Sequence, residues 1–435
     1  MPPSPTALPP RLTRTGELTR ARAPHSRWRN FVLFLSVMGP GIITANVDND
    51  AGGITTYSVV GAQFGTRLLW SLIPITLALI VVQEMGARMG AITGKGLSDL
   101  IREHYGVRVT FWILLAMLVC NWGNTVAEFS GIASSLEIFG IPAQVSVPVC
   151  AILVWLLVTR GNARSVEKLF LVACVFYVAY PISGFLAHPP WKEMLVATVV
   201  PQWENSRAFV SILIGTVGTT IAPWMQFYLQ SAVVEKGVSA ETYALSRLDV
   251  IVGCIVTDVV AFFIIVACAV TLNRHGIHIE SAKDAALALE PLAGKYASRL
   301  FSFGLFNASF FAASILPLST AYLVCEGFGW ESGIGKPYKD ARQFFWLFTG
   351  MVVLGAGVVL IPHLPLIRIM LFTQVINGIL LPFILVFMLL LINKENLMGR
   401  AKNGPWFNGI AWATTVIMVV LTGYLVVTGV QDLFT

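Results

Sequence analysis

Oxygen-bearing polar side chains interrupt the first apolar stretch of the chain. Between Gly39 and Gly53 the sequence reads GPGIITANVDNDAGG, and the polar residues at its centre are Asn46, Asp48, Asn49 and Asp50. An acid at the centre of a bilayer costs about 2.5–3.5 kcal/mol even on insertion scales, so two such acids require a function. Because glycines follow, we expect a broken helix whose free carbonyls face a cavity. Acidic side chains together with free backbone carbonyl oxygens at membrane depth predict a cation site.

A loop outside the membrane is the alternative interpretation of this stretch. It is disfavoured because the apolar runs on either side are each too short to span a bilayer alone. The composition also agrees with a membrane setting: 56% of the residues are hydrophobic and 12% are charged, against about 25% charged in soluble domains. Mean hydropathy is +0.74. The chain of 435 residues is therefore expected to be an all-α, polytopic membrane protein.

Cysteine usage and motifs exclude several other classes. All six cysteines lie in apolar runs and no C-x-x-C pair occurs, which predicts buried core residues and neither a disulfide framework nor a metal cluster. No phosphate-binding G-x-x-x-x-G-K-[ST] loop is present. We expect no enzyme activity, no resident cofactor and no nucleic-acid partner; the partners are the lipid bilayer and a transported ion, and the protein is expected to be a monomer.

Hydrophobic patterning predicts about eleven transmembrane segments after a basic tail. Residues 1–30 are rich in Pro, Ser and Arg and are expected to form a disordered cytoplasmic tail. The segments are 31–65 (broken), 68–93, 108–138, 143–159, 164–187, 207–236 (broken), 247–272, 297–327, 341–361, 366–393 and 406–430.

Charge distribution orients these segments with the N-terminus inside. Of the 29 Lys and Arg residues, a cytoplasmic N-terminus leaves only eight outside: Arg67, Lys192, Arg207, Arg274, Lys283, Lys295, Arg299 and Arg368. Positive residues concentrate on the cytoplasmic side of membrane proteins. The predicted location is the plasma membrane, and this bias explains the net charge of +6.

The sixth segment is interrupted like the first. Residues 215–223 combine two glycines, two threonines and Pro223, and an internal proline removes a backbone hydrogen bond and frees carbonyls. Two broken helices five segments apart are typical of inverted repeats around a central site. We therefore expect a first repeat at 31–187, a second at 207–393, and an extra helix at 406–430, all within one transporter domain, 31–435.

Several blocks of the chain resemble, in order, those of the NRAMP family of divalent-metal transporters. In the first helix of that family, Gly-Pro-Gly is followed by an Asp-Pro-Gly-Asn break and a Gly-Ala-Gln run, and residues 39–70 are similar to this pattern. The later blocks are Thr93–Gly106, Val126–Gly131, Ile221–Ser231 and Thr373–Phe383. The resemblance covers segments one to ten and implies a leucine-transporter-type fold and divalent-metal transport.

Departures from the family pattern concern the metal ligands. Alignment places Asp50 at the family's aspartate and Gly53 at its liganding asparagine, and the Met-Pro-His of the sixth helix is Ala222-Pro223-Trp224. The absence of this asparagine and this methionine resembles the pattern of the NRAMP-related magnesium transporters, which also lack them. Soft sulfur selects later transition metals, whereas carboxylate, carbonyl and water oxygens suit Mg²⁺ and Mn²⁺, and Mg²⁺ keeps several waters. The predicted metal-site residues are Asp50 as the main ligand, carbonyls near Val47 and Thr219, Asp48 and Asn49 shaping the cavity, and Gly53 and Ala222 widening it.

Residues expected in a proton pathway are also altered. The family's aspartate three positions before Glu128 is Thr125, its sixth-helix histidine is Trp224, and its tenth-helix glutamine is Leu380, although Asn377 and Gln374 lie nearby. Proton relays need connected acids or histidines, and all six histidines fall in tails, loops or helix ends: His25, His104, His188, His275, His278 and His363. Glu128 is left with either a pathway role or a packing role.

Two further acids lie within the apolar segments. Glu84 is expected near the inner end of the second segment, where Arg88 can pair with it, and Asp258 in the seventh has no assigned role. The predicted function is divalent-cation import, of Mg²⁺ and also Mn²⁺, without proton coupling. The alternatives are a proton-coupled Mn²⁺/Fe²⁺ importer and a sodium-coupled amino-acid symporter. The paired acids Asp48 and Asp50 would repel an organic carboxylate.

Overall fold

The described part of the chain is all helical. The computed structural model describes residues 39–161, 163–277, 279, 286, 295–362, 364 and 366–434. Within these ranges the chain forms α-helices and short 3-10 helices, and contains no strand. The predicted all-α fold is confirmed. The predicted tail, residues 1–30, lies outside the described residues.

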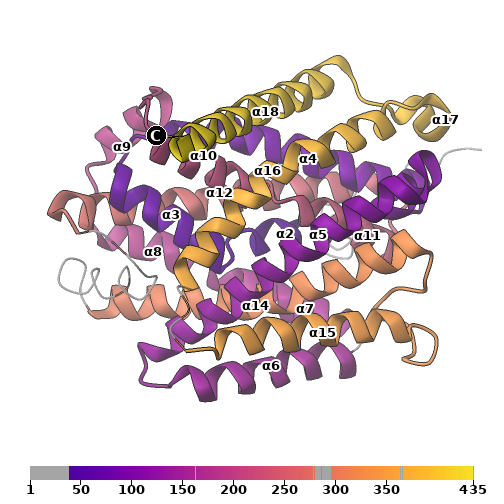
Figure 1. The fold of residues 1–435 in the computed structure, drawn as a ribbon, viewed down its shortest axis with the longest axis horizontal. Coiled ribbons are helices and arrows are strands. Elements are labelled where there is room, and N and C mark those ends of the chain that lie inside the picture. Colours follow the sequence, from indigo (N-terminus) through magenta and orange to yellow (C-terminus); the bar gives the residue numbers. More distant parts are fainter. Residues whose placement is uncertain are drawn as a thin grey trace, which may run out of the picture.

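The helices are labelled in Figure 1. The first half of the chain contains α2 (Pro40–Val47), α3 (Ala51–Phe64), η1 (Leu69–Ser71), α4 (Leu72–Thr93), α5 (Leu97–Glu137), α6 (Ala143–Arg160), α7 (Ala163–Phe176), α8 (Ala179–Leu186) and α9 (Trp191–Val199). The second half contains α10 (Arg207–Thr220), α11 (Pro223–Glu235), α12 (Tyr243–Thr271), η2 (Asn273–His275), α14 (Lys295–Phe328), α15 (Arg342–Val359), α16 (Leu366–Ile392), α17 (Glu395–Met398), η3 (Gly399–Ala401) and α18 (Pro405–Phe434).

Ten helical stretches within the described residues are long and apolar enough to cross a membrane. They correspond to the second to eleventh predicted segments, and the first is the pair α2 and α3, neither of which could span alone. Two segments differ in detail from the prediction. The fifth divides into α7 and α8 at residues 177–178. The third begins early, at Leu97, and bends at Gly106, whose φ of 81° is available to glycine but costly for other residues.

Both predicted helix breaks are present. Helix α2 ends at Val47 and α3 starts at Ala51, so residues 48–50 are non-helical and carry both acids of the motif. Helix α10 ends at Thr220, and α11 starts at Pro223, a position where proline needs no hydrogen-bond partner. Both breaks have a local cause. Pro223 blocks continuation of α10, and Asp50 starts α3 as its N-cap residue, with Gly52 and Gly53 in the first turn of the new helix.

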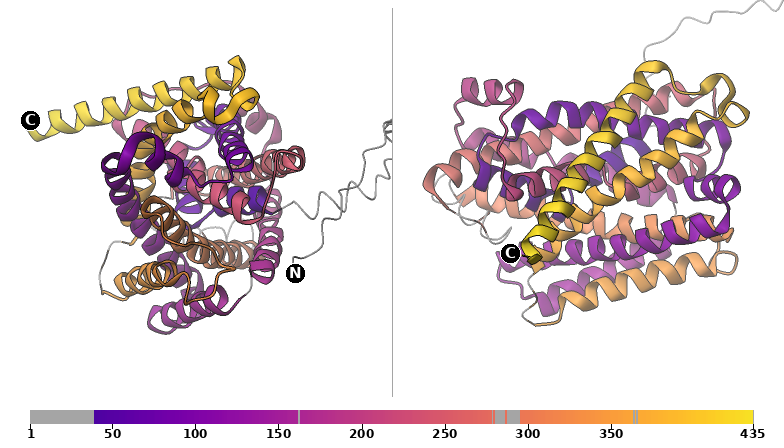
Figure 2. Two further views of the ribbon diagram at one scale, coloured as in Figure 1. Left: turned by 90° about the vertical axis from the view of Figure 1, so that its right-hand side faces the viewer. Right: turned by 45° about the horizontal axis from the view of Figure 1, so that its top comes forward.

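The broken helices lie inside the bundle. Helix α12 packs along both α2 and α3, α10 packs against α16 and α3, and α14 packs against α5. Helix α18 lies along the outside of the bundle, where it contacts α16, α10 and α4 (Figures 1 and 2). Large apolar side chains are exposed on outer helices such as α6 and α18, as expected for surfaces that face lipid.

Candidate metal centre

Asp50 is held at the start of helix α3 by the backbone. It is the N-cap residue, and its Oδ1 accepts a hydrogen bond of 2.6 Å from the Gly53 amide. Helix N-termini carry unpaired amides and a partial positive charge, which stabilise a carboxylate. The side chain is buried, with 4% of its surface exposed. The cap therefore holds the Asp50 carboxylate in place at the break between α2 and α3.

Glu128 reaches the same helix end from helix α5. Its Oε2 accepts a hydrogen bond of 3.1 Å from the Ala51 amide, while its Oε1 has no partner among the described residues. The carboxyl groups of Glu128 and Asp50 also lie close enough to interact electrostatically. Two carboxyl groups thus bond to the first turn of one helix, where a shared proton or a cation would relieve the repulsion between their like charges.

Oxygen atoms from both broken helices converge where Gly53 has no side chain. A Cβ atom added to Gly53 would lie 2.5 Å from the Asp48 carbonyl oxygen, 3.1 Å from Thr219 Oγ1 and 3.3 Å from Asp50 Oδ1. The Thr219 hydroxyl has no hydrogen-bond partner in the described part of the chain. A carboxylate, a carbonyl and a hydroxyl therefore share one small space, as a site for a hard cation requires.

The other predicted metal-site residues surround this space less directly. Val47 is the buried last residue of α2, and Ala222 is the buried N-cap residue of α11. Asn49 is turned away toward α12, where its amide nitrogen donates to the Thr257 carbonyl at 3.1 Å. Because the last carbonyls of a helix lack intrahelical partners, the end of α10 at Thr220 also presents backbone oxygens.

The predicted pathway residues fall in different places. The Thr125 hydroxyl donates to the Asn121 carbonyl at 2.8 Å, and its methyl group faces Gly355, so it does not join the site. Trp224 is buried on α11, where its carbonyl accepts a hydrogen bond of 3.2 Å from Ser319. Asn377 is engaged in an amide network: its nitrogen donates to Asn124 at 3.1 Å and to Gln374 at 3.0 Å.

Gln374 is a neighbour of the site that sequence reasoning did not assign. A Cβ added to Gly52 would lie 1.9 Å from Gln374 Nε2, so this side chain lies directly over the glycine. The same Nε2 has no hydrogen-bond partner among the described residues. The sequence signal was a Gln and an Asn, three residues apart, in an otherwise apolar segment.

The site is closed in this conformation. Asp48 and Asp50 are almost completely buried, and Glu128 is fully buried. Among the described residues, no three His, Cys, Asp or Glu side chains are grouped to hold a metal ion. An ion here would consequently depend on carbonyl, hydroxyl and water oxygens in addition to carboxylates.

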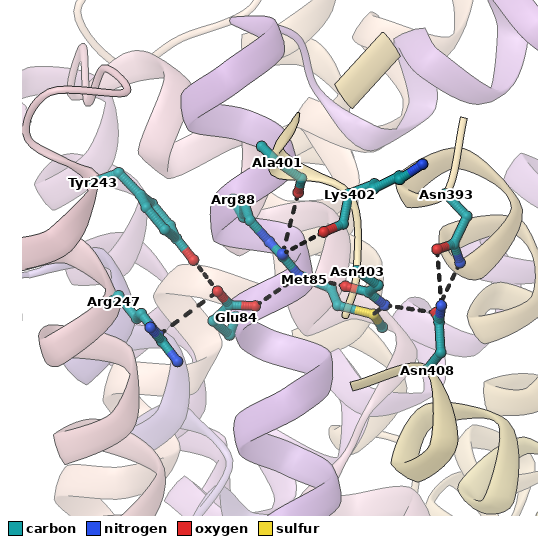
Figure 3. A network of polar contacts seen from close by, with 10 residues as sticks. All are labelled: Glu84, Met85, Arg88, Tyr243, Arg247, Asn393, Ala401, Lys402, Asn403 and Asn408. Carbon is teal, nitrogen blue, oxygen red and sulfur yellow. Dashed lines mark hydrogen bonds and ion pairs between the residues drawn. The ribbon is translucent and has the colours of Figure 1, made fainter. Parts of the chain in front are cut away.

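A second polar network lies near one end of α4 (Figure 3). Glu84 forms a 3.0 Å ion pair with Arg88, as predicted, and also accepts a hydrogen bond from Tyr243. Arg88 donates in turn to the Ala401 carbonyl at 3.1 Å and to Asn403. The network connects α4 and α12 with the segment before α18, so we interpret it as stabilising the packing of these helices.

Two broken helices that enclose a buried oxygen-lined site define a membrane transporter of the leucine-transporter type, not an enzyme. The chain belongs to the NRAMP family: residues 41–428 match the family profile described as "Natural resistance-associated macrophage protein-like". The family expected from the sequence blocks is thereby confirmed.

Relatives and solved structures agree with this assignment. The chain is 27% identical over 402 residues to the divalent metal cation transporter MntH of Klebsiella pneumoniae subsp. pneumoniae, covering 90% of this chain and 94% of the relative. It is also 27% identical to the MntH of Deinococcus radiodurans, with coverages of 95% and 93%. The fold matches a point mutant of the Eremococcus coleocola manganese transporter with a TM-score of 0.76, at 21% identity, over 92% of this chain and 87% of that one.

Proposed function

We propose that this protein imports divalent metal cations across the plasma membrane, transporting Mg²⁺ and also Mn²⁺. The observation that carries the proposal is the convergence of Asp48, Thr219 and Asp50 oxygens around Gly53. The similar MntH proteins are named divalent metal cation transporters, which supports the coarser part of the proposal. In the proposed orientation the N-terminus is cytoplasmic, and residues 31–187 and 207–393 form the two repeats of a monomeric transporter.

The choice of Mg²⁺ rests on the chemistry of the donor atoms. Gly53 and Ala222 offer no side-chain ligand, and the atoms converging on the site are oxygens. Hard oxygen ligands suit Mg²⁺, Ca²⁺ and Mn²⁺, whereas a thioether would favour softer metals. Mg²⁺ also keeps part of its hydration shell, and Gly53 and Ala222 supply no side-chain ligand that would replace those waters.

Mn²⁺-selective transport is the second candidate function. The MntH relatives cover almost the whole chain, and a similar fold is that of a protein described as a manganese transporter. Mn²⁺ accepts oxygen ligands as well, so the site chemistry is compatible with it. Family membership weighs against the sodium-coupled amino-acid symporter.

Transport is proposed to run without a coupled proton. Trp224 and Thr125 occupy the positions of two expected proton carriers, and the Thr125 hydroxyl is bonded within its own helix. Of the six histidines, His104 on α5, His188 after α8 and His275 in η2 are described, and the other three lie outside the described residues. Glu128, which lies beside Asp50, is the acid to test as a proton carrier.

Uptake by the purified protein in proteoliposomes tests both candidates. We expect Mg²⁺ to enter, and millimolar Mg²⁺ to inhibit Mn²⁺ uptake, because neither ion meets a soft ligand. Protein-free vesicles and the Asp50→Ala variant serve as controls. Mn²⁺ uptake that millimolar Mg²⁺ leaves unchanged would reject the magnesium proposal and favour the Mn²⁺ candidate.

A further inference from the structure

Two buried carboxylates beside the helix break have no bonding partner. Asp48 is 1% exposed and Asp258, on α12, is 5% exposed. Both oxygens of each side chain lack a hydrogen-bond partner among the described residues. Buried polar groups are normally hydrogen-bonded, and a buried charge is normally paired. Two such side chains together therefore point to a ligand.

The packing of α12 brings these two acids to one place. Thr257, the residue before Asp258, donates its hydroxyl to the Ala45 carbonyl, and its own carbonyl accepts the Asn49 amide at 3.1 Å. These bonds fix α12 against the residues on both sides of Asp48. Asp258 also lies close enough to Asp48 for the two carboxylates to interact electrostatically. The two carboxylates are thus neighbours across the break.

Hydroxyl groups close to the pair are already engaged. Thr76 lies beside Asp258, but its hydroxyl donates to the Leu72 carbonyl at 2.7 Å. The Tyr57 hydroxyl is 2.7 Å from the Thr220 oxygen, which itself donates to Thr216, so Tyr57 is the donor in that bond. Among the described residues no Lys, Arg or His pairs with either acid.

We propose that Asp48 and Asp258 form a second divalent-cation subsite, adjacent to the one around Asp50. Two carboxylates without donors match the charge of one hard divalent cation, and Mg²⁺ is commonly held by one or two carboxylates plus retained waters. Asp48 would serve both subsites, since its carbonyl oxygen faces Gly53 while its carboxylate remains free. An ion at one subsite would repel an ion at the other, which promotes release in multi-ion pathways.

The inference rests on the proposed function. Its test is a count of bound ions, which can be measured without any transport. Mn²⁺ is titrated into the purified full chain in detergent, and free Mn²⁺ is measured by electron paramagnetic resonance. We expect two Mn²⁺ per wild-type chain, displaced by excess Mg²⁺, and one per chain in Asp258→Asn, in Asp48→Asn and in Asp50→Ala. Glu326→Gln, which removes another buried acid on α14, should still bind two.

The outcomes separate the subsite from the proposed function. The second subsite would be overturned by any of three results: one Mn²⁺ per wild-type chain, two Mn²⁺ in Asp258→Asn, or no Mn²⁺ in both asparagine variants. A single Mn²⁺ in the wild type is also what we expect if Asp48 and Asp258 are simply protonated. The asparagine variants keep the side-chain shape, and monodisperse elution of each variant is required before its ions are counted. Two bound ions without any transport would reject the proposed function and leave the subsite standing.

Discussion

Glu128 on α5 caps helix α3 through a 3.1 Å hydrogen bond from the Ala51 amide to its Oε2, 77 residues away in sequence. Glutamine retains an oxygen acceptor at this position, whereas alanine does not. We expect Glu128→Gln to keep measurable metal uptake and Glu128→Ala to lose about 1 kcal/mol of stability, the usual value of a helix cap, together with most uptake. Thermal unfolding in detergent and vesicle uptake measure the two effects. Equal uptake by both variants would refute the capping role.

Asp50→Ala should abolish metal uptake and leave the protein folded. The substitution removes the carboxylate of the proposed site and also a charge that is costly at membrane depth. Uptake into proteoliposomes and elution from a sizing column are the measurements. The matched control is Glu103→Ala, which removes an exposed acid paired with Lys95. Wild-type uptake by Asp50→Ala would refute the assignment of the metal site.

Gly53→Ala should strongly reduce uptake, by tenfold or more as a rough figure. Its Cβ would lie 2.5 Å from the Asp48 carbonyl, a backbone atom that cannot move without shifting the break. Gly357→Ala on α15 is the control, because a Cβ there meets nothing within 4 Å. If the two variants transport equally well, the space at Gly53 is not part of the pathway.

The Glu84–Arg88 pair should contribute to stability more than an exposed pair does. Both side chains are largely buried, and removing one partner of a buried pair costs up to about 3–5 kcal/mol when the other charge is left unpaired. In Arg88→Ala, Arg247 at 3.8 Å and Tyr243 still face Glu84, so the loss should lie below that range. Arg88→Ala should therefore lower the midpoint of thermal unfolding. Lys95→Ala breaks the exposed pair with Glu103 and should cost about 1 kcal/mol or less. Similar midpoints for the two variants would contradict this ranking.

Metal uptake should not acidify the vesicle lumen. A divalent cation gains about 2.3 kcal/mol per charge per 100 mV of membrane potential, roughly 4.6 kcal/mol in total, which is enough for accumulation without a proton. A pH-sensitive dye inside proteoliposomes, at a clamped potential, reports any proton flux during Mg²⁺ uptake. A metal-dependent pH change absent from protein-free vesicles would assign proton transfer to Glu128 or another acid.

Local sequence determined the membrane class, the helical segments and the positions of both breaks. These features depend on the apolar length needed to span a bilayer and on residues that start or stop their own helices, Asp50 as an N-cap and Pro223 as a helix breaker. For the same reason the motif residues Asp50 and Gly53 could be singled out before any packing was known. The fifth segment was predicted as unbroken, although its division at residues 177–178 lies within the turn before Pro181, whose ring and missing amide disfavour continued helix there.

Only the tertiary structure decided which distant groups meet at the breaks. Glu128 caps Ala51, Gln374 lies over Gly52, and Asp258 approaches Asp48, whereas Thr125, singled out in the sequence, bonds within its own helix. Such contacts depend on how each helix is rotated about its axis and on the angle at which two helices cross. Both quantities are fixed when the side-chain ridges of one helix pack into the grooves of the other. The neighbouring sequence predicts in which helix a residue lies, but the packing of the whole bundle decides which atoms its side chain contacts.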